Sequence, residues 1–300
     1  MKKLSLCVLG SGAVAGALLG SWPSALDAQG QPPPDQPAVT VRGQTYTPRS
    51  ILARNMGTEQ DQTTAFPPHK VVGNIYYVGT RTLSAFLITT PQGHVLVNTT
   101  YERNVPVIEK SMADLGFKFA DIKIILGTHA HGDHQEGDAL AKQKTGAQVM
   151  AMAEDVPALQ GIRPGGKEHP VDRVLRDGES VTLGGTALVA HLTAGHTRGC
   201  TTWTTRVQDG NRMYDVVIHC SLRAPGNLTP PVVAEFNRTF KVVRALPCDV
   251  PLGDHPAQYN MHAKHAKLSG GTNPFVDPDN CDLETDIQEA MFRAALEGTK

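Results

Sequence analysis

Four side chains of the types that bind metal ions in proteins lie within six residues of one another: His129, His131, Asp133 and His134. They follow the apolar run Ile124-Ile125-Leu126, which predicts a buried strand. Alternate side chains of an extended segment point to the same side, so we expect His129 and His131 to bind one metal ion together.

Gly132 allows the backbone to turn after this first pair. Asp133 and His134 are then expected to project from the bend toward a second metal ion. Neutral imidazole suits zinc, and a carboxylate adds an anionic oxygen that helps to hold a dication and its water. The alternative interpretation is two solvated histidines beside a turn aspartate, which a lone His-x-His pattern would favour.

Two later histidines are candidates to complete the two sites. His196 lies in a loop of small residues, 193–200, as expected for a tight turn that presents one imidazole. His255 follows a short apolar segment and Asp254, which is an alternative ligand at that place. We expect His196 to join the first pair and His255 the second. Three ligands each leave coordination open for water, as in catalytic zinc sites.

We expect the other histidines not to bind a metal ion directly. His69, His94 and His169 fall in predicted turns and are expected at the surface. His191 and His219 lie on predicted strands near the site, where they are candidates to hold the second nitrogen of a ligating imidazole.

Composition excludes several classes of function. The 300 residues are 40% apolar and carry a formal net charge of -1, so the chain can bury a substantial core. It has no basic patch with interleaved aromatic residues, which nucleic-acid binding would require. A small-molecule substrate is therefore expected, with no nucleic-acid partner.

The N-terminus has the pattern of a secretory signal. Two lysines precede an apolar stretch rich in Ala and Gly, and residues 1–28 are expected to be cleaved after Ala28. The alternative is an uncleaved membrane anchor. No later stretch is apolar enough to span a bilayer, so the mature protein is expected in the periplasm. Residues 29–49, rich in Pro and Gln, are expected to form a flexible arm, and residues 50–300 one catalytic domain.

Four of the five cysteines belong to the predicted mature chain. An even number in an oxidising compartment favours disulfides, and three pairings are possible. We favour Cys248 with Cys281, and Cys200 with Cys220. Four buried free thiols are the alternative, because a sequence does not determine Cα separations.

The predicted elements alternate between strand meanders and helices. Strands are expected at 71–78, 84–90, 94–98 and 123–128, with helices at 105–115 and 138–144. Further strands are expected at 200–206 and 214–220, and further helices at 232–246 and 282–296. This order suits two sheets packed face to face with helices outside, in one domain.

The metal motif resembles that of the metallo-β-lactamase superfamily, and the resemblance covers most of the chain from about Phe66. It implies an α/β fold, classed as α+β in some schemes: a four-layer αββα sandwich with a one- or two-zinc site along one edge. Many relatives, glyoxalase II among them, place a metal-bridging aspartate after the strand at 214–220. This chain has Cys220-Ser221-Leu222-Arg223-Ala224-Pro225-Gly226 there, which is similar to subclass B3 β-lactamases.

The resemblance to subclass B3 implies a ligand set and a reaction. The residues that match its ligands are His129, His131, His196, Asp133, His134 and His255. It implies two Zn2+ ions per chain and hydrolysis of the β-lactam amide bond by a metal-bound hydroxide, conferring antibiotic resistance. Asp133 would orient the hydroxide, and Ser221 and Arg223 would bind the substrate carboxylate. A monomer is expected.

Two departures from the family pattern keep other functions open. Many members have Asp where this chain has Asn98, and a smaller polar residue where it has Arg223. One alternative is another hydrolase of the same fold, acting on a thioester or a lactone. The other is a periplasmic zinc-binding protein without turnover.

Overall fold

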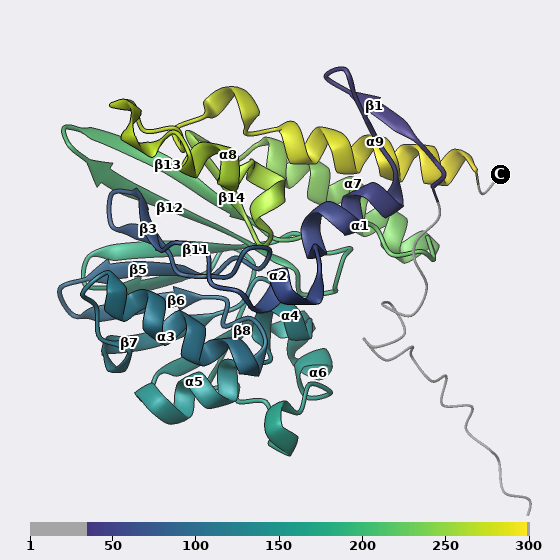
Figure 1. Cartoon of the computed structure of the whole chain (residues 1–300). Helices are drawn as coiled ribbons and strands as arrows, with labels where there is room; N and C mark the ends of the chain where they lie inside the picture. Colours follow the sequence, from purple (N-terminus) through teal and green to yellow (C-terminus); the bar gives the residue numbers. More distant parts are fainter. Residues whose placement is uncertain (1–34, 299–300) are drawn as a thin grey trace, which may run out of the picture. The chain divides into compact units, whose positions relative to one another are not determined.

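Two β-sheets lie face to face in the computed structural model, which describes residues 35–298 (Figure 1). The seven strands of the first sheet are β3 (His69–Val72), β4 (Ile75–Tyr77), β5 (Phe86–Thr90), β6 (Gly93–Val97), β7 (Ile122–Leu126), β8 (Gln148–Met152) and β9 (Arg173–Leu175). Strands β3 to β6 form an antiparallel meander, whereas β6 to β9 are parallel. The predicted signal peptide, 1–28, lies outside the described residues.

The second sheet has five strands in sequence order: β10 (Ser180–Leu183), β11 (Thr186–Leu192), β12 (Thr201–Asp209), β13 (Arg212–His219) and β14 (Val250–Gly253). The first four are antiparallel, and β14 pairs in parallel with β13. Apolar side chains from both sheets form one buried cluster, in which Phe86 and Leu126 of the first sheet join Trp203 and Ile218 of the second. This cluster is the core of the sandwich.

Helices cover the outer faces of both sheets. Helices α3 (Val105–Asp114) and α5 (Asp138–Thr145) pack on the seven-stranded sheet through a second apolar cluster. Helices α7 (Pro230–Arg244) and α9 (Leu283–Glu297) pack together through Phe236, Phe240 and Phe292. Figure 1 shows them on the side of the sheets opposite to α3 and α5. The predicted αββα sandwich is therefore confirmed.

The remaining helices are short: α1 (Pro48–Met56), α2 (Glu59–Thr63), α4 (Gly132–Gln135), α6 (Val156–Leu159) and α8 (Met261–His265). None of the helices in residues 35–298 combines the length and the apolar character that a bilayer crossing needs.

The predicted strand at 71–78 is wrong as one element. The chain turns back at Gly73 and Asn74, so that β3 and β4 form a hairpin. Gly73 has a φ of 54°, and a Cβ atom there would lie 2.8 Å from the carbonyl oxygen of Gln208. Only glycine fits this turn without strain.

The predicted arm also needs correction, because part of it is folded. Strands β1 (Val39–Val41) and β2 (Gln44–Tyr46) form a hairpin, and α1 begins before the predicted boundary at residue 50. Val39, Val41 and Tyr46 belong to an apolar cluster with Ile287 and Met291 of α9. The hairpin is ordered because it packs on α9, about 240 residues later in the chain, whereas the prediction of a flexible arm rested on the Pro-rich composition alone.

Three histidines expected at the surface are buried instead. His69 stacks between Tyr77 and Phe275, at ring-centroid distances of 5.5 and 5.4 Å. His94 lies on β6 beside Phe117, and Nε2 of His169 lies 3.0 Å from a backbone carbonyl oxygen. Local turn patterns do not show that distant aromatic and polar groups cover these rings.

Both favoured disulfides are confirmed. Cys200 and Cys220 join the beginning of β12 to the end of β13. Cys248 and Cys281 join the residues before β14 to the residues before α9. The first bond therefore lies beyond the carboxyl end of β13, and the second lies before the amino end of β14, which pairs in parallel with β13.

Candidate metal centre

The structure brings together the first predicted set of three ligands. His129 and His131 lie in the loop after β7, and His196 lies in the loop between β11 and β12. One donor atom from each lies within 4.8 Å of the others. The ring centroids are 4.7 to 4.8 Å apart in all three pairs. Three nitrogen donors this close can bind one metal ion.

The second predicted set also lies together. Asp133, His134 and His255 place their donor atoms within 4.8 Å of one another. Oδ2 of Asp133 is 3.2 Å from Nε2 of His134 and 3.8 Å from Nε2 of His255. The ring centroids of His129 and His134 are 4.2 Å apart, so the two sets of ligands lie next to each other.

The ligand loop has a conformation different from the predicted one. His129 and His131 do not belong to an extended strand, because the His131 backbone N–H donates to the His129 carbonyl oxygen at 2.9 Å in a tight turn. Helix α4 starts directly afterwards and carries Asp133 and His134 on its first turn. The side chains therefore converge through a turn and a helix start.

Backbone carbonyls orient the two ligands that come from later in the chain. Nδ1 of His196 donates to the Arg223 carbonyl oxygen at 2.8 Å. Nδ1 of His255 donates to the Thr82 carbonyl oxygen at 3.0 Å. With the ring proton held at Nδ1, the lone pair of Nε2 is free to bind a metal ion.

Buried nitrogen atoms without partners test whether a metal ion fits. Among the described residues, Nε2 of His129 and both ring nitrogens of His134 have no hydrogen-bond partner. A buried polar atom left unpaired costs about 1 to 3 kcal/mol. Metal ions bound by the two sets would satisfy Nε2 of His129 and one of the two ring nitrogens of His134. The donor set of imidazoles with one carboxylate suits zinc.

Electrostatics keep most of the imidazoles neutral, as metal ligands must be. Burial, together with the neighbouring His134, lowers the pKa of His129 to about 3. Burial also lowers the pKa values of His131, His196 and His255.

Asp133 and His134 form a coupled pair. Burial raises the pKa of Asp133, but His134 outweighs this effect and holds it well below its usual value. Burial lowers the pKa of His134, but Asp133 outweighs this effect and raises it. In the absence of metal the two side chains thus stabilise each other as an ion pair.

Asn98 supports the ligand loop although many relatives have Asp at its position. Its Oδ1 accepts hydrogen bonds from the backbone N–H of Thr128 at 2.9 Å and from the Thr128 hydroxyl at 3.2 Å. An amide oxygen can accept these bonds as a carboxylate would. The departure therefore preserves the contact and removes a negative charge.

Sequence reasoning missed a buried carboxylate that joins the two loops of the first set. Asp155 accepts from the backbone N–H groups of Ala130 at 2.8 Å and Gly199 at 2.6 Å, and from the hydroxyl of Thr197 at 2.8 Å. It lies in a short 3-10 helix after β8, where no sequence pattern indicated a role.

The two histidines expected to hold ligating imidazoles do not do so. Nε2 of His191 bonds to the hydroxyl of Thr204 at 2.8 Å. His219 is buried, and its ring nitrogens have no hydrogen-bond partner among residues 35–298. Backbone carbonyls and a second buried carboxylate, Asp254, lie behind the ligands instead.

The two predicted substrate-binding residues differ in position. The half-buried side chain of Arg223 lies close enough to the metal centre for its charge to help lower the pKa values of His131 and His196. No carboxylate of the described residues lies within ion-pair distance of it. Ser221 is 4% exposed, so little of it is available to a substrate.

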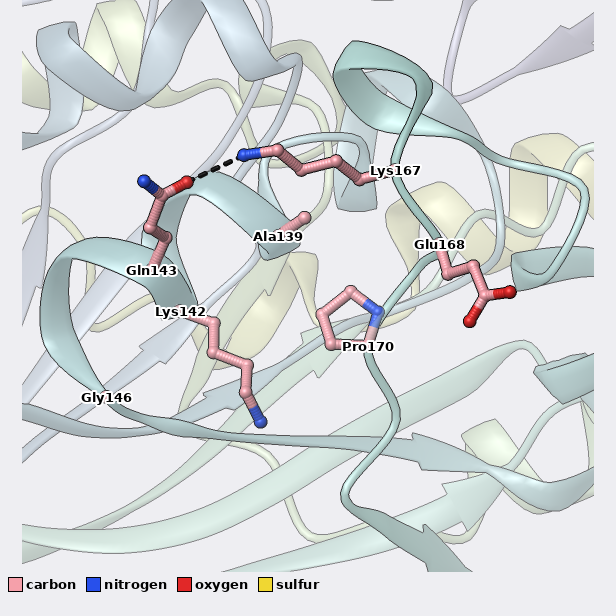
Figure 2. Close-up of a pocket in the computed structure, with 7 residues that line it drawn as sticks. All are labelled: Ala139, Lys142, Gln143, Gly146, Lys167, Glu168 and Pro170. Carbon is pink, nitrogen blue, oxygen red and sulfur yellow. Dashed lines mark hydrogen bonds between the residues drawn. The ribbon is translucent and has the colours of Figure 1, made fainter.

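A separate pocket of about 330 Å³ lies between α5 and the loop after α6. Figure 2 shows its lining residues, with Lys167 bonded to Gln143 at 2.7 Å. The lining residues are Ala139, Lys142, Gln143, Gly146, Lys167, Glu168 and Pro170. None of them is a proposed ligand, so this pocket is distinct from the metal centre.

Known proteins are similar to this chain in sequence and in fold. Residues 78–209 match the family described as the metallo-beta-lactamase superfamily. The FEZ-1 metallo-β-lactamase from Legionella gormanii is 40% identical, with a TM-score of 0.75 over 79% of this chain and 97% of that chain. BJP-1, a subclass B3 metallo-β-lactamase of Bradyrhizobium japonicum, is 37% identical, with a TM-score of 0.73 over 80% of this chain and 97% of that chain.

A third similar structure is LRA-12, described as a class B3 di-zinc metallo-β-lactamase from an Alaskan soil metagenome. It is 30% identical, with a TM-score of 0.73 over 80% of this chain and 97% of that chain. In all three comparisons the matched region covers 97% of the relative's chain. The chain therefore belongs to the metallo-β-lactamase superfamily, as an enzyme of the subclass B3 type.

Proposed function

We propose that this enzyme hydrolyses the amide bond of β-lactam antibiotics with two zinc ions per chain, and that it confers resistance from the periplasm. The observation that carries the proposal is the pair of adjoining three-ligand sets with unpaired, inward-facing imidazole nitrogens. The similar proteins are metallo-β-lactamases, and one is described as a di-zinc enzyme.

The proposed ligands divide between the two ions. His129, His131 and His196 would hold one, and Asp133, His134 and His255 the other. When bound there, zinc supplies Lewis acidity and activates a water molecule at neutral pH.

Asp133 is the residue proposed to handle the proton. Its carboxylate lies between Nε2 of His134 and Nε2 of His255, at 3.2 and 3.8 Å. Its lowered pKa keeps it ionised at neutral pH, so it can orient the attacking water and accept a hydrogen bond from it. The ring-opened product needs a proton on its nitrogen, which Asp133 is placed to relay.

Arg223 is proposed to bind the carboxylate that β-lactam antibiotics carry. Burial lowers its pKa, with Asp133 opposing the shift, yet a guanidinium remains charged at neutral pH. Arg223 is half-buried and has no carboxylate partner among residues 35–298. A substrate carboxylate would stabilise its charge and could accept two hydrogen bonds from it. We propose that Ser221 assists where the substrate reaches it.

Hydrolysis of a chromogenic cephalosporin by the purified protein tests this function. We expect turnover that a chelator abolishes and zinc restores, with close to two zinc ions per chain by elemental analysis. A thioester and a lactone serve as competing substrates. Preferential turnover of either would establish the other hydrolase function, and full zinc loading without turnover of any substrate would establish a zinc-binding protein.

Localisation needs a separate experiment. The predicted signal peptide, 1–28, implies that the mature protein begins at Gln29 in the periplasm. Cell fractionation and N-terminal sequencing should find that mature end. Bacteria expressing the full chain should tolerate more β-lactam than bacteria expressing residues 29–300 alone, and equal tolerance would contradict export-dependent resistance.

A further inference from the structure

Asp254 is a fully buried carboxylate between the end of β14 and the proposed ligand His255. Nε2 of Gln258 donates to its Oδ1 at 2.7 Å, which holds one side of the carboxylate. Oδ2 lies 3.3 Å from Nδ1 of His129. In the part of the chain that the structure describes, no group forms a hydrogen bond to that oxygen, so its contact with His129 is one of ion-pair distance.

The same carboxylate lies beside a ligand of the second set. One donor atom each of His129, His134 and Asp254 falls within 4.8 Å of the others. His129 belongs to the first set and His134 to the second. Asp254 therefore lies beside one imidazole of each set, where the two sets adjoin.

Other neighbours of His129 Nδ1 are weaker hydrogen-bond acceptors. The Thr128 hydroxyl lies 3.3 Å away, and Sγ of Cys220 lies 3.6 Å away within a disulfide. A neutral hydroxyl or a sulfur competes poorly with a charged carboxylate, whose hydrogen bonds are about twice as strong. Asp254 is thus the one charged group among these neighbours, and a proton on Nδ1 of His129 would face its carboxylate.

Charge balance gives Asp254 a second effect. Asp133 is the one anionic side chain among the six proposed ligands, and Arg223 adds a positive charge nearby. Asn98, which holds the ligand loop, is neutral and adds no negative charge. A buried negative charge at Asp254 would offset part of the charge of two dications, because the interior screens it weakly.

We propose that Asp254 is a positioning residue shared by both metal ions, which orients His129 and His134 and raises the affinity of both sites for zinc. The proposal rests on the proposed function only in that it assumes zinc binding. Loss of a carboxylate behind a ligating imidazole typically costs 10- to 100-fold in metal affinity.

Stepwise zinc affinities, measured by competition with a chromophoric chelator, test the proposal. Asp254→Asn preserves the shape and can keep the Gln258 contact, but it removes the charge. We expect it to weaken both zinc sites by about 10- to 100-fold, with the unfolding midpoint of the metal-free protein nearly unchanged. The cobalt(II)-substituted protein should show altered absorption at both sites. Asp254→Ser provides the same comparison if the Asn variant does not fold.

Asp155→Asn is the matched control, because Asp155 is equally buried but holds only the two loops of the first set. It should weaken one zinc site. If Asp254→Asn weakens only one site or neither, or weakens binding only in proportion to lost metal-free stability, the proposal is overturned. If the protein hydrolyses no β-lactam but Asp254→Asn still weakens both zinc sites, this proposal is supported and the proposed function is refuted.

Discussion

Three histidines at the centre have a neighbour at the second ring nitrogen: His129, His196 and His255. Backbone carbonyls of Arg223 and Thr82 hold His196 and His255, so these contacts persist when the side chains at 223 and 82 change. His129 instead lies against the side chain of Asp254. Substitutions can therefore separate the substrate role of Arg223 from its backbone role in holding His196.

Arg223→Ala should raise KM for a β-lactam more than it lowers kcat, because it removes a substrate contact and leaves the ligands in place. A charge-assisted hydrogen bond is worth about 1.5 to 3 kcal/mol, which corresponds to about a 10- to 100-fold rise in KM. Steady-state kinetics measure this, with Arg223→Lys as the conservative variant and zinc content as the control. An unchanged KM would remove Arg223 from the substrate site.

His69 should make the protein less stable in acid. Burial lowers its pKa from 6.5 to about 4, partly offset by its hydrogen bond to the Pro67 carbonyl. Between these two values the unfolded chain binds a proton that the folded chain does not. Stability is thus lost as the pH falls from about 6.5 to about 4, by about 3 kcal/mol in total.

Urea denaturation of the metal-free protein at pH 7 and pH 4.5 measures this effect. Wild type should lose about 2 to 3 kcal/mol more than His69→Phe over this interval, since only wild type must protonate the buried ring. Other titrating groups contribute to both proteins and cancel in the difference. Parallel curves for the two proteins would show that His69 is not responsible.

The ligands lie on short connections between long, buried elements. The loop after β7 is held by Asn98 from the end of β6 and by Trp203 of β12, whose Nε1 donates to the Gly127 carbonyl oxygen at 3.0 Å. Asp155, after β8, joins this loop to the one that carries His196. Both sheets therefore position the centre. Helices α1 and α9 do not carry ligands and instead pack against each other through Ile51, Ile287 and Met291.

Ile51→Ala should destabilise the fold without changing the centre. Ile51 is 1% exposed in the cluster that joins α1 to α9, and truncating a buried isoleucine costs about 2 to 5 kcal/mol. Denaturant unfolding measures the loss, while zinc content and kcat at low temperature should stay at wild-type values. Val174→Ala, at a side chain 51% exposed, is the control and should change stability by less than about 0.5 kcal/mol.

At the scale of the whole molecule, the centre joins segments from four distant parts of the sequence. The proposed ligands come from residues 129–134, 196 and 255, and a carbonyl at residue 82 holds the last of them. Metal ions bound at this junction would connect the two sheets in addition to their chemical role. Binding and folding are therefore expected to be coupled.

Removal of zinc should lower the stability of the whole fold. A ligand that binds only the folded state at 100 times its Kd contributes about 3 kcal/mol. Thermal unfolding with excess zinc and with excess chelator should differ accordingly. A variant with His196→Ala and His255→Ala should respond to neither addition, and identical midpoints for loaded and chelated wild type would contradict the expectation.

Residue types and spacing, together with the resemblance to a known family, predicted the sandwich and the six proposed ligands, and both favoured disulfide pairings are present. Strand periodicity, helix ends and the His-x-His-x-Asp-His spacing are local properties, and local sequence records them directly. Residues 39–46, His69 and His169 were predicted wrongly, because their burial depends on partners far along the chain.

The tertiary structure alone decided what lies behind the ligands. Asp155 and Asp254 have no distinctive local pattern, and each gains its role from contacts across loops that folding brings together. The sequence by itself determined which side chains can bind metal and where the strands that carry them end. Long-range packing determined which nitrogen His196 and His255 present, because that choice depends on a hydrogen-bond partner supplied by another segment.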